Sequence, residues 1–116
     1  MPQIDVELAL HALDGNLELL KDLASMFVED VPILLDQLKT AVSDDHPLQA
    51  RSAMHSLKGL VATFYAKTGV EIAQRLENSA ANGSLDLFMS GELEKLEECI
   101  RLVIADFEAR GWLSRV

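Results

Sequence analysis

The sequence predicts an all-α protein: an antiparallel up-and-down four-helix bundle with an additional short N-terminal helix. Apolar residues recur at alternating steps of three and four over four long segments. No segment shows the strict apolar–polar alternation that is typical of a strand. The connections between the segments are short, which favours antiparallel neighbours. A length of 116 residues fits one domain, which we expect over residues 1–116.

The first expected helix covers residues 5–13 and ends at Asp14-Gly15. Asn16 can cap a long second helix, because its side-chain oxygen can accept from a free N–H group of the first turn. The apolar seam of that second helix alternates steps of four and three, which is typical of helices in a bundle. Its members are Leu20, Ala24, Phe27, Val31, Leu34, Leu38 and Ala41.

A third helix is expected after the segment SDDHP, residues 43–47. Either Asp44 or Asp45 can cap it. Pro47 suits its first turn, since proline lacks the N–H group that would be unpaired there. The apolar pattern extends this helix to about Ala66.

Two more helices complete the bundle. Thr68 and Glu71 match a capping box that would open the fourth helix. Residues 82–91 interrupt the pattern, with a turn of helix expected around 87–88, and Ser90 can cap the last helix. The expected buried faces are Gly69, Ile72, Ala73, Leu76 and Ala80 in the fourth helix, and Leu93, Leu96, Ile100, Val103 and Phe107 in the last.

The net charge of −9 argues against two classes of partner. A nucleic-acid binder needs a basic patch to neutralise phosphates, and an anionic membrane attracts basic segments. Cys99 is the single cysteine, so we expect no disulfide, and the histidines have no metal-ligand spacing. No signal peptide or membrane-spanning stretch is recognisable, so we expect a cytoplasmic protein that is a monomer by default.

The third expected helix carries the most informative residue. Met54, Leu57, Val61 and Phe64 cluster on its core side, and His55 falls roughly 140° from the centre of that cluster. The histidine should therefore point outward. An exposed histidine is most often an ordinary polar surface residue, and that interpretation stays open at this point.

Small residues follow His55 at steps of three and four, so they form a stripe with it along one face of the helix. Two basic side chains flank this stripe. A partner protein could approach the imidazole closely over such a stripe, and Gly59 costs roughly 1 kcal/mol of helix stability without an evident packing reason. These residues are candidates for a docking face: Gly59, Ala62 and Ala66 along the stripe, Ser52 beside it, and Arg51 and Lys58 at its edge.

Neutral imidazole is a good nucleophile, and phosphoryl transfer needs positive charge for the phosphate oxygens. Lys58, one turn from His55, could supply that charge, with Arg51 as a second candidate. The chain has no glycine-rich phosphate loop and no kinase signature, so it should have no kinase activity of its own. A phosphoryl group on His55 would have to come from another protein.

The pattern His55-Ser56-Leu57-Lys58-Gly59, in register with the helical pattern of nearly the whole chain, resembles histidine-containing phosphotransfer (HPt) domains. The resemblance implies that His55 carries the phosphoryl group, that Lys58 assists with charge and that Gly59 clears the approach. In several members a Glu or Gln holds the second ring nitrogen. The matching position, 22 residues after the histidine, is Glu77, and Gln74 is the alternative.

The resemblance also implies partners: a response-regulator receiver domain and a hybrid sensor histidine kinase. It implies no cofactor in this chain, with Mg²⁺ expected on the receiver. The family would relay the phosphoryl group between receiver aspartates through the histidine.

Tyr65 is the clearest departure, since most members have glycine ten residues after the histidine. Tyr65 falls nearer the core side than His55, so we expect it to alter helix packing rather than the nucleophile. This departure keeps a second hypothesis open, a non-catalytic adaptor that binds and regulates a receiver domain without phosphorylation. A bundle with a purely structural role is a third.

Overall fold

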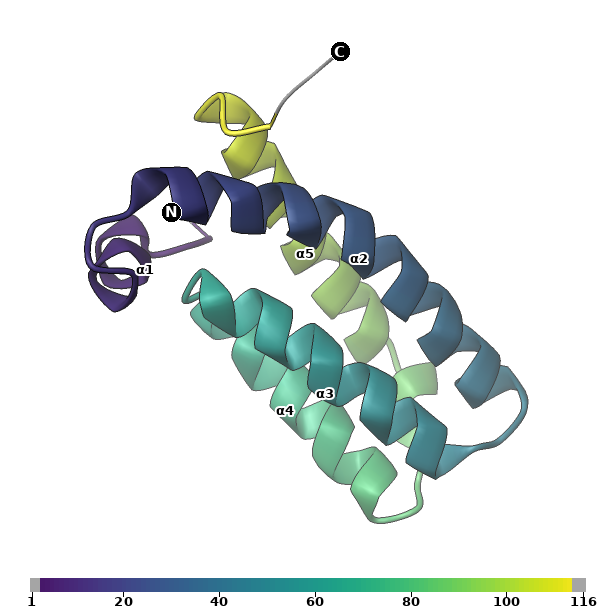
Figure 1. Ribbon diagram of the computed structural model, residues 1–116. Helices are drawn as coiled ribbons and strands as arrows, with labels where there is room; N and C mark the ends of the chain where they lie inside the picture. The colour runs from purple at the N-terminus through teal and green to yellow at the C-terminus, as the bar shows by residue number, and fades with distance from the viewer. Residues whose placement is uncertain (1–2, 114–116) are drawn as a thin grey trace.

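The computed structural model describes residues 3–113, and over that range it contains helices and no strand. The predicted fold class is confirmed. Helices α2 to α5 run alternately up and down, and the short α1 lies across one end of the bundle (Figure 1). The elements are α1 (Val6–Ala12), α2 (Leu17–Ser43), α3 (Pro47–Thr63), α4 (Lys67–Ala81), the 3₁₀ turn η1 (Asp86–Met89) and α5 (Glu92–Ala109).

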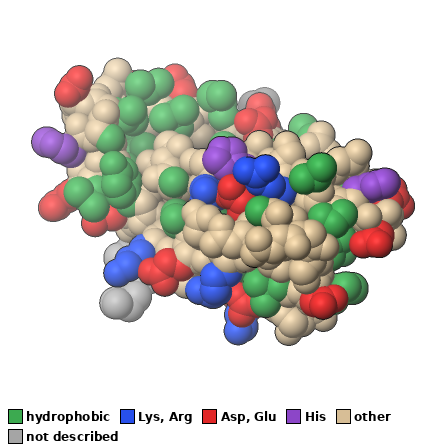
Figure 2. Space-filling model, turned by 90° about the horizontal axis from the view of Figure 1, so that it is seen from below, with side chains coloured by type: hydrophobic (Ala, Val, Ile, Leu, Met, Phe, Trp, Pro, Cys, Tyr) green, Lys and Arg blue, Asp and Glu red, His purple; other side chains and the backbone are tan. Residues whose placement is uncertain are grey.

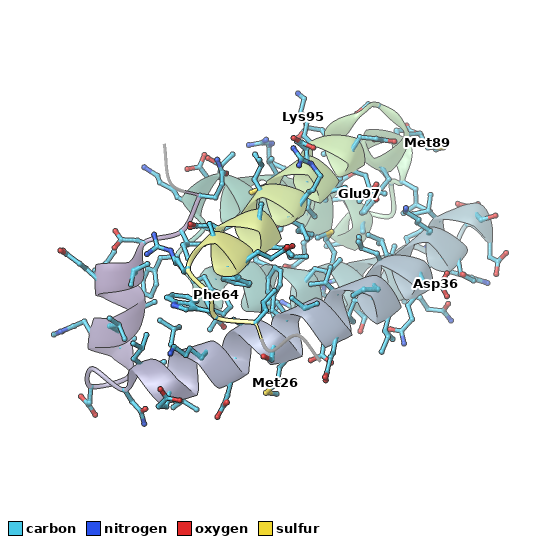
Figure 3. The ribbon with its side chains drawn as sticks, turned by 90° about the horizontal axis from the view of Figure 1, so that it is seen from above. Met26, Asp36, Phe64, Met89, Lys95 and Glu97 are labelled. Atoms are coloured by element: carbon cyan, nitrogen blue, oxygen red, sulfur yellow. The ribbon has the colours of Figure 1, made fainter. Side chains whose placement is uncertain are left out.

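The core lies where the apolar seams of the sequence predicted it. Every predicted seam residue of α2, α4 and α5 is buried except Leu34, which is half-buried against the core. At the α1 end of the bundle, Phe64 of α3's end packs against Phe27 and Phe107, with ring centroids 4.7–5.7 Å apart. Figure 3 shows Phe64 directed into the interior, whereas Met26 of α2 projects outward. These rings join α2, α3 and α5 at one level.

Side chains cap the N-terminal ends of α1 and α2. Asp5 accepts a hydrogen bond from the Leu8 N–H at 3.1 Å, and the Asn16 side chain accepts from Leu19 N–H at 3.0 Å, which confirms the Asn16 cap. The backbone N–H of Asp5 also donates to the carbonyl of Phe64 at 3.0 Å. This last bond attaches the start of α1 to the end of α3.

The predicted caps of α3 and α4 are wrong. Asp45 adopts a left-handed conformation with φ 55°, and His46 occupies the cap position of α3 without a side-chain cap bond. Pro47 is at the first helical position, as expected. Helix α4 starts at Lys67, so Thr68 lies within the first turn instead of before it.

The start of α5 also differs from the prediction. The Ser90 hydroxyl donates backwards to the Leu87 carbonyl at 2.7 Å, so it does not cap α5. Gly91 takes the cap position with φ 102°, which glycine adopts without steric cost. The expected turn of helix around 87–88 is confirmed as η1.

Helix α3 ends at Thr63, earlier than Ala66. The N–H of Tyr65 donates to the Ala62 carbonyl at 3.0 Å, and the N–H of Ala66 donates to the Val61 carbonyl at 3.2 Å. This pair of bonds is the Schellman motif, in which the penultimate residue is left-handed. Tyr65 has φ 55°, lies beyond the end of α3 and is 41% exposed. The expectation that Tyr65 alters the packing of this helix against a neighbour is therefore wrong.

The same motif corrects the position of Ala66. We expected Ala66 on the exposed stripe of His55, but it is fully buried. The chain leaves the helix before Ala66 and turns this residue inward, where the motif commonly makes an apolar contact. Ala66 therefore cannot be part of a docking face.

Within residues 3–113, no helix combines the length and apolar character needed to cross a bilayer. The described residues likewise contain no group of three or more His, Cys, Asp or Glu side chains placed to hold a metal ion.

The left-handed Tyr65 predicts an unusual response to glycine. The left-handed conformation costs a non-glycine residue about 1–2 kcal/mol in the folded state, and glycine avoids this cost. Glycine also makes the unfolded chain more flexible, which cancels part of that gain in stability. We expect Tyr65→Gly to be more stable than Tyr65→Ala by about 1 kcal/mol in urea unfolding, since both variants lose the same phenol. The control is Ala62→Gly inside α3, which should cost about 1 kcal/mol. Equal stabilities of the two Tyr65 variants would contradict the assignment.

Candidate functional site

His55 lies on the outer side of α3. Its side chain is 69% exposed, whereas Met54, Leu57 and Val61 on the opposite side are fully buried. The outward orientation predicted from the helical periodicity is confirmed. Figure 2 looks onto the α3–α4 side of the molecule, where a histidine adjoins basic and acidic side chains near the middle of the face.

The second ring nitrogen of His55 is held by Glu77 of α4. The His55 Nδ1 lies 3.1 Å from Glu77 Oε2, and the Lys58 Nζ lies 2.8 Å from Glu77 Oε1. One carboxylate thus bridges a histidine and a lysine that are three residues apart on α3. Among the described residues, Glu77 is the buried charged side chain.

The protonation state of Glu77 follows from its surroundings. Burial raises the pKa of its carboxyl, but hydrogen bonds and charges from Lys58 and His55 outweigh burial, and the net pKa is below the ordinary 4.5. Glu77 is therefore ionised at neutral pH and can only accept hydrogen bonds. The shared proton belongs on His55 Nδ1, which leaves the lone pair of neutral His55 on Nε2.

Helix pairing brings these side chains together. The short turn at residues 64–66 sends α4 back along α3. Residues three apart in sequence lie on the same face of a helix, so such a pair on α3 can meet such a pair on α4. His55 and Lys58 on α3 meet Glu77 and Gln74 on α4. Gln74, the alternative partner for His55, instead accepts a hydrogen bond from Lys58 Nζ at 3.0 Å.

The remaining candidate residues, apart from Ala66, are on the surface. A Cβ atom built at Gly59 would have no heavy atom within 4 Å, so this position faces open space. Ala62, Arg51 and Ser52 are exposed as well. These residues lie on the side of α3 that carries His55, as the helical periodicity predicted.

Leu48 is a further residue of the site that the sequence pattern did not lead us to predict. This leucine is 73% exposed and, with Arg51, Ser52, Ser56 and Glu77, lines a shallow cavity of about 320 Å³ at His55. Leu48 lies seven residues before His55, which places the two on one helix face. That spacing was the available signal, since an apolar residue on the polar side of an amphipathic helix stands out.

The lowered pKa of Glu77 predicts a pH-dependent role in stability. A carboxyl whose pKa is lower in the folded state stabilises the fold above its unfolded pKa, and this contribution is lost as pH falls through the folded pKa. We expect Glu77→Gln to be less stable than the wild type at pH 7, with the difference shrinking below about pH 4.5. Urea unfolding between pH 7 and pH 3 measures it. Glu94→Gln, on the exposed side of α5, is the charge-matched control; a Glu77→Gln difference independent of pH would contradict the assignment.

A comparison with known proteins identifies the family of the chain. The family model described as "Hpt domain" matches residues 22–108, which include the whole of α3 and α4. A search of curated proteins and a search of solved structures gave no match. With three quarters of its length matched and a bundle of the expected architecture, the chain belongs to the Hpt domain family, whose members carry phosphoryl groups on histidine in two-component phosphorelays.

Proposed function

We propose that His55 Nε2 accepts a phosphoryl group from the aspartyl phosphate of a receiver domain, such as that of a hybrid sensor histidine kinase, and passes it to a response regulator. One observation carries this proposal: His55 is 69% exposed while the buried carboxylate of Glu77 holds its Nδ1. A nucleophilic imidazole needs both a free nitrogen and a fixed tautomer.

In the accepting step, the Nε2 lone pair attacks phosphorus. The N–P bond forms as the P–O bond to the receiver aspartate breaks, and that aspartate leaves as a carboxylate. The Nδ1 proton stays, so the phosphorylated ring carries a positive charge facing Glu77. In the donating step, the carboxylate of the second receiver attacks phosphorus, and neutral imidazole leaves.

Positive charge near His55 supports this reaction. Lys58 is one turn from the histidine, and Arg51 lines the same shallow cavity. Charge-assisted hydrogen bonds to phosphoryl oxygens stabilise the transferring group. We propose that Mg²⁺ comes with the receiver domain, where an acidic pocket would hold it.

The surface around His55 suits a docked receiver domain. Gly59 and Ala62 offer no side-chain obstacle, and Leu48 gives an apolar contact at the edge of the cavity. Interfaces commonly place such an apolar residue among polar neighbours. We propose that the receiver covers this face, with the chain acting as a monomer in the cytoplasm.

The direct test is phosphorylation by a labelled phospho-receiver. We expect the wild type to gain an acid-labile label and His55→Gln to gain none, since the nucleophile is removed. His11→Gln, at an exposed histidine on α1, should be labelled like the wild type.

A failure of that test has a defined meaning. Equal labelling of the wild type and His55→Gln would exclude His55 as the acceptor. Receiver binding that His55→Gln leaves unchanged in calorimetry, without any label on the wild type, would favour the non-catalytic adaptor. No receiver binding at all would favour a purely structural bundle.

Substitutions at Gly59 separate partner access from stability. Gly59→Ala should raise the free energy of unfolding by about 1 kcal/mol, because alanine is the better helix former and its Cβ meets nothing. Gly59→Gln should gain some of the same stability, yet weaken receiver binding because its side chain stands on the docking face. Unfolding and receiver-binding titrations measure the two effects. Receiver affinity unaffected by Gly59→Gln would place the docking face elsewhere.

A further inference from the structure

Lys58 is restrained in a way that its role as a phosphate cation does not require. Its side chain is 21% exposed, against 69% for His55. The ammonium group lies 2.8 Å from Glu77 Oε1 and 3.0 Å from Gln74 Oε1. Two oxygens from neighbouring turns of α4 therefore hold one cation of α3.

Gln74 is itself oriented by a third residue of α4. Its amide Nε2 donates to Asn78 Oδ1 at 2.8 Å, one turn further along the helix. Because the amide nitrogen is engaged with Asn78, the amide oxygen is directed towards Lys58. The contacts form a chain from Asn78 through Gln74 to Lys58, Glu77 and His55.

We propose that Gln74, oriented by Asn78, is a positioning residue that acts on phosphoryl transfer through Lys58. An ammonium group has three N–H donors. The Gln74 oxygen takes one of these donors, and the ion pair with Glu77 holds the ammonium close to α4, which leaves a donor for an oxygen of the phosphoryl group at His55. This inference rests on the proposed phosphotransfer function and adds to it a second residue of α4.

The surroundings of Gln74 favour this role over a role in stability. Gln74 and Asn78 are both exposed, so their hydrogen bonds compete with water and add little to folding. Without Gln74, the ammonium keeps one protein partner, Glu77, and can rotate about that contact. The loss would therefore be seen in the transfer step rather than in the fold.

The experiment is a double-mutant cycle read by single-turnover phosphoryl transfer from a phosphorylated receiver domain to His55. The variants are Gln74→Ala, Lys58→Ala and the double variant. We expect Gln74→Ala to lower the maximal transfer rate about three- to tenfold, the value of one ordinary hydrogen bond that competes with water, with the half-saturating receiver concentration unchanged. In the Lys58→Ala background, Gln74→Ala should have no further effect.

Asn78 supplies the conservative controls. Asn78→Ala should slow transfer in the same direction as Gln74→Ala, by a smaller factor. Asn78→Asp keeps an oxygen acceptor for the Gln74 amide and should retain the wild-type rate. An equal loss from Gln74→Ala in both backgrounds, or no loss in either, would overturn the proposal.

A second measurement separates this proposal from the proposed function. The ¹H–¹⁵N signal of the Lys58 ammonium reports its exchange with water and needs no phosphate. Faster exchange in Gln74→Ala than in wild type would support the contact, and unchanged exchange would contradict it. Absence of any transfer to wild type would instead refute the phosphotransfer function, and with it a role of Gln74 in transfer.

Discussion

The site depends on one buried carboxylate that must be neutralised. Glu77 lies at the contact of α3 and α4, and a charge removed from water is tolerated only with partners of opposite charge and hydrogen bonds. Its two oxygens face different residues, His55 Nδ1 and Lys58 Nζ. The same requirement therefore fixes the imidazole tautomer, the ring orientation and the place of the nearby cation. A neutral residue at this position would fix none of them as firmly.

One face of helix α3 packs in the core, and the opposite face carries the site. Met54, Leu57 and Val61 hold it against the bundle, while His55 and Gly59 face solvent. The outward face is costly, since glycine weakens a helix by about 1 kcal/mol. The aromatic packing around Phe64 lies at the C-terminal end of the same helix and contributes burial that offsets this cost. Helix α3 therefore presents an open stripe on one face while its other face is buried in the core.

Periodicity was enough to predict the architecture and the outward His55, because burial follows spacing along a helix. The Asn16 cap was predictable for the same local reason, since one side chain bonds a backbone group three residues away. Thr68 had the right sequence for a cap, but its place was decided by the turn before it. That turn needs a left-handed residue, and tyrosine does not signal one as glycine would. Ala66 was misplaced as a consequence.

The sequence left two candidates, Glu77 and Gln74, for the side chain that holds the second ring nitrogen of His55. It could not decide between them. Both side chains lie on the side of α4 that faces α3, and the choice depends on the offset between the two helices. The structure gives His55 the buried acid and Lys58 the exposed amide, with the acid shared. Leu48 was missed for another reason: its spacing to His55 was visible in the sequence, but isolated exposed leucines are common, and only the cavity beside it indicates a contact surface.

The shared acid also accounts for how an already acidic chain could accept a further negative group. With a net charge of −9, the molecule as a whole opposes a phosphoryl group, so neutralisation has to be local. In the resting site, the charges of Lys58 and Glu77 balance each other beside the His55 ring. In the proposed phosphorylated state the ring becomes a cation, and Glu77 gains a second positive partner at Nδ1. Lys58 stays held by Glu77 and Gln74, with an N–H donor left for the phosphoryl oxygens.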